Sequence, residues 1–427
     1  CSRRGIAQYL ARAVAKLSRT AASFRKFAIA AERNLRILMV TDVYFPRVNG
    51  VSTSIQTFRR EFHALGHEVV LVAPDYGAVT DDEAGILRVP AIPVPLDPED
   101  RLMHWGRLRR LLRRLGGGFD LVHIQTPFLA HYAGVAFSDA MGVPRVETYH
   151  TYFEEYLYHY VRFLPKPALK ALARRFSRGQ CNDLDGLVVP SRQMRAVLEG
   201  YGVSAPMEVI PTGLVLEDFA GGDGIAFRAR YRIPPDRPVI AYVGRVAFEK
   251  NIDFLLRVTA RLRGVIPDIL FVVSGEGPAL AALRERARNS GLEKHALFVG
   301  YLDRRGPLLD CYRAANAFVF ASRTETQGLV LLEAMALGTP VVSTAMMGTR
   351  DVLRHGEGAL VVREDEAEFA SAVAALLQDE SLRTRLGHAG ERYARQWSAR
   401  ATAERLITFY GRVTAACAAA RASARTA

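Results

Sequence analysis

The residues best suited to chemistry lie in one segment, Glu325 to Pro340, which holds two carboxylates with seven residues between them. Glu325 is expected in a loop after an apolar run, and Gly328 allows the backbone to approach a ligand closely before a helix begins. The free N–H groups and the positive dipole end of such a helix suit an anion. The pattern therefore predicts an anion-binding site at this loop.

The second carboxylate, Glu333, falls more than one turn into the same predicted helix. Its neighbours are apolar, and no Lys or Arg lies between it and Arg350. A buried carboxylate is costly unless hydrogen-bond donors reach it, and a pair of sugar hydroxyls would meet that need. Donation from local backbone or from Ser and Thr side chains is the alternative.

Two further loops each follow an apolar run and lead into a predicted helix. The loop Gly244 to Asn251 carries two cations, Arg245 and Lys250, five residues apart. The loop Asn49 to Val51 precedes a helix expected to begin near Ser52, and an ordinary turn glycine is the alternative interpretation of Gly50. Neither loop has the G-x-G-x-x-G spacing, which argues against a nicotinamide or flavin cofactor.

Short β-rich runs alternate with longer helical stretches from residue 36 onward. This alternation predicts parallel sheets covered by helices on both faces, and it restarts after the Gly- and Pro-rich stretch Gly213 to Pro238. The fold class is therefore α/β, with two doubly wound domains that meet near residue 215. The predicted strands are 36–41, 68–73, 120–124, 145–149, 186–190 and 207–211, then 239–243, 269–274, 296–299, 317–321, 340–343 and 359–362. The predicted parts are a basic extension at 1–34, domains at 35–213 and 214–395, and a helix at 396–427 whose Ala-rich end, from Thr414, is expected to fray.

The composition is that of a globular protein, with 427 residues, 49% hydrophobic and 24% charged. The four cysteines lie far apart and form no C-x-x-C pair, so neither a disulfide framework nor a metal site is expected, and a reducing cytosol fits. No apolar run approaches the ~18 residues of a membrane-spanning helix. We expect a cytoplasmic protein that either is soluble or lies peripherally on the inner face of the plasma membrane.

The formal charge of +13 is concentrated in three segments. Residues 1–34 carry eight Lys or Arg against one acid, while 101–114 and 162–178 each carry six and no acid. In the second segment four leucines (108, 111, 112 and 115) form an apolar helical stripe, which is typical of a solvated helix packed on its own domain or of a membrane-surface helix. Candidate contacts to an anionic membrane surface are Arg107, Arg110, Arg113, Arg114, Lys166, Lys170, Arg174 and Arg175.

From residue 36 to about 410 the chain resembles the family 4 glycosyltransferases. Their mark is the glutamate pair, here Glu325 and Glu333, followed by A-x-A-x-G-x-P. Four more motifs occur in the family's order: N-G-V at 49–51, G-R-x-x-x-E-K-N at 244–251, S-G-E-G-P at 274–278 and V-G-Y at 299–301. The resemblance implies the GT-B fold, in which two Rossmann-like domains meet across a cleft. The second domain would hold mainly the nucleotide sugar, and the first mainly the acceptor.

The resemblance also implies residue roles for a retaining transfer that uses no metal or cofactor. Arg245 and Lys250 would neutralise the leaving diphosphate. Glu333 would accept bonds from ribose hydroxyls and Glu325 from the transferred sugar, while the backbone at 327–329 would meet the sugar and the β-phosphate. Same-face displacement is favoured, since no nucleophile is evident. The implied catalytic residues are His150, Arg245, Lys250 and Glu325. The implied donor-binding residues are Gly50, Val51, Gly244, Arg245, Lys250, Glu276, Gly277, Tyr301, Glu325, Gln327, Gly328, Leu329 and Glu333.

His150 follows a predicted strand, at the position where this family carries a histidine near the sugar. The alternative interpretation is a core histidine with its hydrogen bonds satisfied, which strand ends also contain. Two other histidines, His123 and His131, are expected to be packing or rim residues.

The segment after His150 resembles the branch of the family that glycosylates diacylglycerol and related lipids. There, H-T-x-Y/F-E-D/E-Y precedes basic and aromatic residues, and the implied acceptor-binding residues are Tyr152, Glu154 and Tyr156. A lipid acceptor is favoured over a soluble sugar or polysaccharide precursor. The donor is a UDP-sugar or GDP-sugar carrying glucose or mannose, and the sequence does not separate these. A nucleotide-sugar epimerase of the same fold is a further alternative. A nucleic-acid partner is not expected, because it would leave the glutamate pair without a role.

Overall fold

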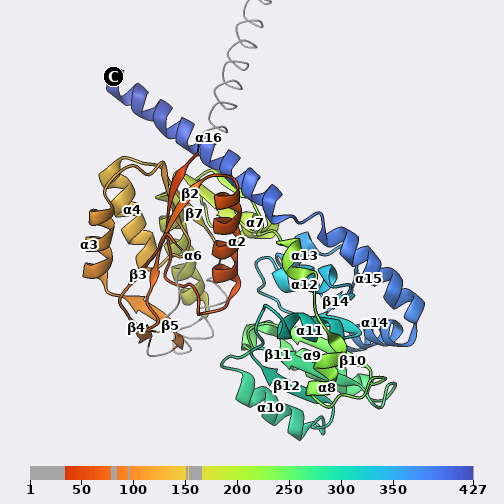
Figure 1. Cartoon of the computed structure of the whole chain (residues 1–427). Coiled ribbons are helices and arrows are strands. Elements are labelled where there is room, and N and C mark those ends of the chain that lie inside the picture. The colour runs from red at the N-terminus through yellow and green to blue at the C-terminus, as the bar shows by residue number, and fades with distance from the viewer. Residues whose placement is uncertain (1–33, 78–83, 95–96, 151, 153–165, 427) are drawn as a thin grey trace, which may run out of the picture.

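The computed structural model describes residues 34–77, 84–94, 97–150, 152 and 166–426. Two separate parallel sheets, each covered by helices, confirm the predicted α/β class with two Rossmann-like domains (Figure 1). All twelve predicted strands are present, with ends that differ by a few residues at most.

The first domain is built on a seven-stranded sheet in the order β3-β2-β1-β6-β7-β8-β9, with parallel neighbours throughout. Its central strands are apolar on both sides because helices cover both faces. One face packs on α2 and α16, and the other on α3, α4, α6 and α7. The strands are β1 (Arg36–Val40), β2 (Glu68–Pro74), β3 (Ile86–Val89), β6 (Leu121–Ile124), β7 (Arg145–Thr148), β8 (Gly186–Val189) and β9 (Met207–Val209). The helices are α2 (Gly50–Ala64), α3 (Trp105–Leu115), α4 (Leu129–Met141), α6 (Lys166–Asn182), α7 (Arg192–Gly200) and α16 (Ala399–Thr426).

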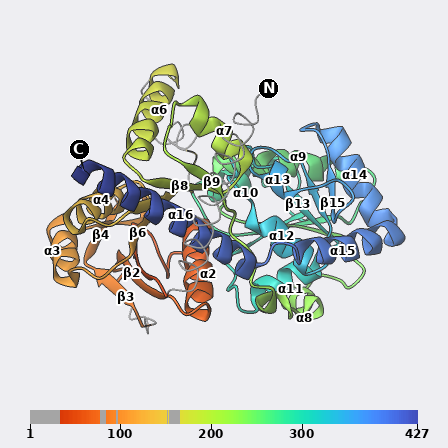
Figure 2. The ribbon, with the colours of Figure 1, turned by 90° about the horizontal axis from the view of Figure 1, so that it is seen from above.

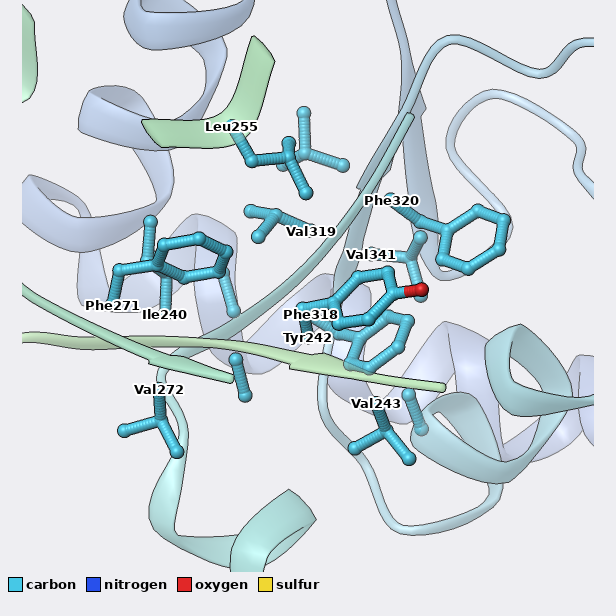
Figure 3. Packing of buried hydrophobic residues seen from close by; sticks show 14 of the residues in the cluster. Ile240, Tyr242, Val243, Leu255, Phe271, Val272, Phe318, Val319, Phe320 and Val341 are labelled. Atoms are coloured by element: carbon cyan, nitrogen blue, oxygen red, sulfur yellow. The ribbon is translucent and has the colours of Figure 1, made fainter. Parts of the chain in front are cut away.

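The second domain has a six-stranded sheet in the order β12-β11-β10-β13-β14-β15, again parallel. Its core contains a row of aromatic rings, in which Tyr242 stacks on Phe320 and Phe320 on Phe318 (Figure 3). The strands are β10 (Val239–Val243), β11 (Leu270–Ser274), β12 (Ala296–Gly300), β13 (Ala317–Phe320), β14 (Val341–Ser343) and β15 (Ala359–Val361). The helices are η1 (Leu216–Phe219), α8 (Gly224–Arg230), η2 (Phe248–Lys250), α9 (Ile252–Leu262), α10 (Leu280–Asn289), α11 (Pro307–Ala314), α12 (Leu329–Ala336), α13 (Thr349–Val352), α14 (Glu366–Gln378) and α15 (Glu380–Ala394).

Three strands of the first domain were not predicted. They are β3, β4 (Ala91–Val94) and β5 (Asp97–Met103), of which the last two form a separate antiparallel pair. Pro90 and Pro93 interrupt this region, and proline within a run argues against a strand except at an edge. The structure places β3 at an edge and β4 in a two-stranded ribbon, where proline is tolerated.

The chain crosses between the domains twice, and the two crossings pair with each other. The Leu214 amide donates to the Trp397 carbonyl at 2.7 Å, and the Ala399 amide donates to the Leu214 carbonyl at 2.9 Å. Glycine is required at 213, because a Cβ there would lie 2.5 Å from the Cα of Ala399. The predicted boundary near residue 215 stays a prediction.

Helix α16 follows the second crossing and runs along the first domain beside α2 (Figures 1 and 2). The Tyr410 hydroxyl and the fully buried His123 Nδ1 are hydrogen-bonded at 2.6 Å, in keeping with a packing role for this histidine. Helix α16 continues to Thr426, and Arg421 donates to the Gly142 carbonyl, so the region from Thr414 is helical in the structure. The expected fraying of this end stays a prediction.

Candidate functional site

A hollow of about 480 Å³ lies between the domains, where loops that follow strands of both sheets meet. The first domain contributes residues 46–50, Thr53 and Tyr76. The second contributes residues at and after the ends of β10, β11 and β12, together with Leu308 of α11 and residues of α12. The predicted donor-binding residues that line it are Gly50, Gly244, Arg245, Glu276, Tyr301, Leu329 and Glu333. The predicted residues outside this lining are Val51, His150, Lys250, Gly277, Glu325, Gln327 and Gly328.

The N-terminus of α2 forms the first-domain wall of the hollow. The Asn49 side chain caps this helix by accepting a hydrogen bond from the Ser52 amide at 2.9 Å. Gly50 is the first helical residue, and a Cβ added there would meet no atom within 4 Å. Packing within the protein therefore does not explain this glycine, whereas a ligand held against the positive end of α2 would.

Lys250 and Glu325 form an ion pair beside the hollow, with Nζ and Oε2 2.8 Å apart. Their side chains are 19% and 22% exposed, so both remain accessible to a ligand. The loop that carries Lys250 is fixed by Asn251, which adopts a left-handed conformation (φ 56°) and donates from Nδ2 to the Ala321 carbonyl at 3.2 Å. The sequence predicted both charges at this site but not that they would pair with each other.

Glu333 is 1% exposed, and its two oxygens have partners within the protein. Arg304 donates to Oε1, and the Tyr312 hydroxyl donates to Oε2 at 2.9 Å. The donors are therefore an arginine and a tyrosine, and not the local backbone, Ser or Thr groups considered as the alternative, and they balance the buried carboxylate without a ligand. Glu333 still lines the hollow, so a role in donor binding stays a prediction.

Arg304 and Tyr312 are the residues that sequence reasoning missed. They lie 29 and 21 residues before Glu333, and only the fold brings them to it. The carboxylate raises the pKa of the Arg304 guanidinium, and burial raises that of the Tyr312 hydroxyl.

Asp42 lies two residues after the end of β1, and the sequence assigned it no role in the site. It accepts hydrogen bonds from the Thr126 hydroxyl at 2.8 Å and from the Ala130 amide at the start of α4. Burial raises its pKa to about 6.

His150 follows β7 and connects the two domains. Its Nε2 and Gln125 Oε1 lie 3.2 Å apart, and its backbone carbonyl accepts a hydrogen bond from the Thr326 hydroxyl at 3.1 Å. Burial lowers the pKa of this imidazole to about 4, so it is neutral near pH 7. The structure thus brings His150 beside Thr326 of the second domain.

The loop 325–328, which the sequence predicts to contact the donor and which is called the donor loop below, ends at Gly328, whose φ of 94° favours glycine. Helix α12 begins at the next residue, as the sequence predicted. The Gln327 side chain does not turn to the hollow; its amide is bonded to the backbone of Thr212.

The residues predicted to bind the acceptor are largely undescribed. Glu154 and Tyr156 lie outside the described residues, and the half-buried Tyr152 packs against the core of the first domain. Its role stays a prediction.

Two of the three basic segments fall largely on helices of the first domain, α3 and α6, whereas residues 1–33 lie outside the described residues. In α3, Leu108 and Leu112 are buried in the core, and the leucine stripe packs on its own domain. The arginines predicted to contact a membrane (107, 110, 113 and 114) are exposed. In α6, a hollow of about 1060 Å³ is lined by Lys170, Arg174, Arg175 and Arg178. The side chain of Lys166 lies outside the described residues.

Family models match both halves of the chain. Residues 225–393 match "Glycosyl transferases group 1", and residues 48–218 match "Glycosyltransferase Family 4". The alpha-monoglucosyldiacylglycerol synthase of Streptococcus pneumoniae is 31% identical over 316 residues, which cover 72% of this chain and 71% of that protein. The chain belongs to the family 4 glycosyltransferases. It is also 29% identical to a GDP-mannose-dependent alpha-mannosyltransferase of Mycobacterium tuberculosis, over 81% of this chain and 89% of that one.

Solved structures place this glycosyltransferase in the GT-B fold. A sucrose-phosphate synthase from Thermosynechococcus elongatus superposes with a TM-score of 0.73 at 22% identity, over 90% of this chain and 100% of that one. Anabaena HepE in complex with UDP-glucose gives a TM-score of 0.69 at 16% identity, over 88% and 98%. The enzyme is therefore a hexosyltransferase with the two-domain architecture that its motifs predicted. Within the described part of the chain, no helix is long and apolar enough to span a membrane, and no cluster of three or more His, Cys, Asp or Glu residues could hold a metal ion.

Proposed function

We propose that this enzyme transfers glucose or mannose, with retention of configuration, from a UDP-sugar or GDP-sugar to a membrane lipid such as diacylglycerol. One observation carries the proposal: the hollow between the domains gathers Arg245, Glu333 and the N-terminus of α2, with the Lys250–Glu325 pair beside it. Cations and a helix N-terminus suit a diphosphate, while carboxylates suit sugar hydroxyls.

The donor diphosphate would lie between Arg245 and Lys250 of the second domain and the backbone at Gly50 of the first. Its ribose would reach Glu333, and its base would border Glu276 and Tyr301, which line the same hollow. The transferred sugar would meet Glu325 and the backbone of the donor loop. The two cations would take the charge that develops on the leaving nucleotide, a task that metal ions perform in other transferases.

Retention requires the acceptor to attack the face from which the diphosphate leaves, or a nucleophile in the protein. No carboxylate of the described residues stands out as a nucleophile, so we favour same-face displacement. The acceptor oxygen then bonds to the sugar as the bond to the diphosphate breaks, and the leaving phosphate takes the acceptor proton. His150, neutral near pH 7, would act as a hydrogen-bonding partner of the sugar and not as a fixed charge.

Two observations support a lipid acceptor. The synthases of Streptococcus pneumoniae and Acholeplasma laidlawii, 31% and 28% identical to this chain, are named for glucosyldiacylglycerol. The basic hollow on α6 and the exposed arginines of α3 suit an anionic membrane surface, where each Lys or Arg contributes about 1 kcal/mol. Because the leucine stripe of α3 is buried, this contact would rest on the charges alone and not on insertion of that helix. We place the enzyme on the cytoplasmic face of the plasma membrane.

The test is a thermal-shift screen of UDP, GDP and their glucose and mannose conjugates, followed by product analysis with membrane lipid extract. We expect one nucleotide to stabilise the fold and its sugar to appear on a lipid. Transfer to a soluble saccharide would refute the lipid acceptor, and an isomerised nucleotide sugar with no transfer would indicate an epimerase.

Site variants test the assignment of the charges. Lys250→Ala and Glu325→Ala should abolish transfer while the unfolding temperature stays near that of the wild type. Lys294→Ala, which removes an exposed lysine of the same domain, is the matched control. Full transfer by either site variant would refute the site. Co-sedimentation with vesicles that contain phosphatidylglycerol, compared with neutral vesicles, tests the membrane contact, and equal binding to both would refute it.

A further inference from the structure

The donor loop is hydrogen-bonded through one side chain to residues 212–215, the first crossing between the domains, which is called the linker below. Gln327 Oε1 accepts from the Thr212 amide at 2.8 Å, and Gln327 Nε2 donates to the Thr212 carbonyl at 2.6 Å. Both residues are buried, at 6% exposure each. A primary amide offers an acceptor and a donor side by side, so it can satisfy the N–H and the C=O of a single residue at once.

Thr212 in turn is hydrogen-bonded to a helix of the first domain. Its hydroxyl donates to Ser54 Oγ at 2.7 Å, and the buried Ser54 lies in α2, the helix whose first residue is Gly50. A continuous chain of hydrogen bonds therefore runs from the donor loop through the linker to the helix that forms the opposite wall of the hollow.

The same loop makes a second contact across the domains through Thr326. Its hydroxyl donates to the backbone carbonyl of His150 at 3.1 Å. Successive residues of the loop thus have different partners: Glu325 pairs with Lys250, Thr326 with His150 and Gln327 with Thr212. Only the first of these contacts lies within the second domain.

The linker has little freedom to absorb a movement of Thr212. The next residue, Gly213, packs directly against Ala399 of the return crossing, and Leu214 is hydrogen-bonded to both sides of that crossing. A displacement of the donor loop that carries Gln327 must therefore move the paired crossings together or break the two buried bonds to Thr212.

We propose that Gln327 is a positioning residue that couples occupancy of the donor loop to the relative placement of the two domains. A sugar nucleotide bound at Glu325 and Gly328 fixes the position of the loop. Through the hydrogen bonds of Gln327 to Thr212, the position of the loop in turn fixes that of the linker and of α2. The proposal rests on the proposed donor site, but it assigns the Gln327 side chain to the linker and not to the donor.

The Thr212 amide reports directly on this contact, because its hydrogen is the one donated to Gln327 Oε1. In the wild type, we expect saturating UDP or GDP, whichever binds, to slow amide exchange across 212–215. In Gln327→Met, which keeps the side-chain length but has no hydrogen-bonding group, exchange at Thr212 should be about tenfold faster without nucleotide, as expected for two lost bonds. The added protection by nucleotide should disappear.

Kinetics separate coupling from simple loss of the donor site. We expect kcat of Gln327→Met to fall by about tenfold or more, while KM for the donor stays within about threefold. Thr326→Val, which removes the bond to His150, should lower kcat in the same direction. Gln378→Met, an exposed glutamine at the end of α14, is the matched control and should match the wild type in exchange and kinetics.

Nucleotide binding with equal protection of the linker in the wild type and in Gln327→Met would overturn the coupling alone. A raised KM with unchanged kcat would overturn it too, since the side chain would then serve donor binding. Failure of any nucleotide to bind the wild type would refute the proposed donor site, and the coupling with it.

Discussion

Replacing Arg304 by Met removes the counter-ion of a carboxylate that has almost no access to water. Glu333 is 1% exposed, and the loss leaves it with one hydrogen bond, from the Tyr312 hydroxyl at 2.9 Å. Breaking a buried ion pair from one side costs about 3–5 kcal/mol, because the remaining charge is uncompensated. Arg304 itself is 29% exposed and the phenol contact remains, so we expect the lower end, about 3 kcal/mol.

Thermal unfolding of three variants measures this cost. In a domain of this size 1 kcal/mol corresponds to roughly 2–4 °C, so Arg304→Met should unfold about 6–12 °C below the wild type. Glu333→Gln should cost less, because an amide oxygen still accepts from Tyr312 and no buried charge remains. Adding Glu333→Gln to Arg304→Met should then restore part of the loss, which gives a coupling free energy of at least about 1 kcal/mol in the double-mutant cycle.

The neighbouring arginine is the control, because Arg305 is exposed and has the same side chain. Arg305→Met should change the free energy of unfolding by less than about 0.5 kcal/mol. Equal unfolding temperatures for Arg304→Met and Arg305→Met would refute the reasoning, since Glu333 would then be balanced without its guanidinium partner.

Two further predictions concern carboxylates, one buried in the first domain and one beside the cleft. Burial raises the pKa of Asp42 from 3.8 to about 6. Between these pH values the folded chain therefore holds a proton that the unfolded chain releases. The contribution of Asp42 to the free energy of unfolding falls by about 3 kcal/mol as pH rises through this window. Asp42→Asn should lose this dependence in urea denaturation from about pH 4 to pH 7, and the same slope in both proteins would contradict the assignment. Glu325→Gln removes the negative charge that competes with a phosphate for Lys250 Nζ, now 2.8 Å away. On the proposed function, nucleotide should therefore bind at least as tightly as to the wild type in calorimetry, while sugar transfer slows by about 100-fold. Weaker nucleotide binding by this variant would argue against Lys250 as a phosphate ligand.

Most of the fold could be predicted from the sequence, because the residue patterns that mark strands and helices are local in the chain. Each run of apolar residues between helical stretches became a strand of a parallel sheet, and the loops that follow β1, β10 and β13 converge at one cleft because carboxyl ends of parallel strands share an edge. Strands β4 and β5 were not predicted because their prolines mask the pattern of residues that marks a strand.

The partners within the site could not be predicted, because they depend on contacts between distant residues. Tyr312 reaches Glu333 from α11, and Arg304 reaches it from the loop before that helix. The Gln327–Thr212 contact spans 115 residues and uses the backbone of Thr212, which leaves no signal in residue types. A motif identifies which residues gather at a site, but their pairing depends on how the two domains pack.

The two ion pairs of the cleft differ in burial. On the proposed function, we therefore expect one pair to separate when the donor binds and the other to stay intact. Lys250 and Glu325 each keep about one-fifth of the side chain exposed, so water can solvate both charges when the pair separates, and breaking it costs less than breaking a fully buried pair. A diphosphate, with more than one negative charge, can therefore displace Glu325 from Lys250 at small cost and leave the carboxylate for the sugar hydroxyls. The Arg304–Glu333 pair has one partner almost fully buried, and breaking it would cost more. On the proposed function, donor entry exchanges the first pair and leaves the second intact, so Glu333 must accept the ribose through lone pairs that Arg304 and Tyr312 do not use.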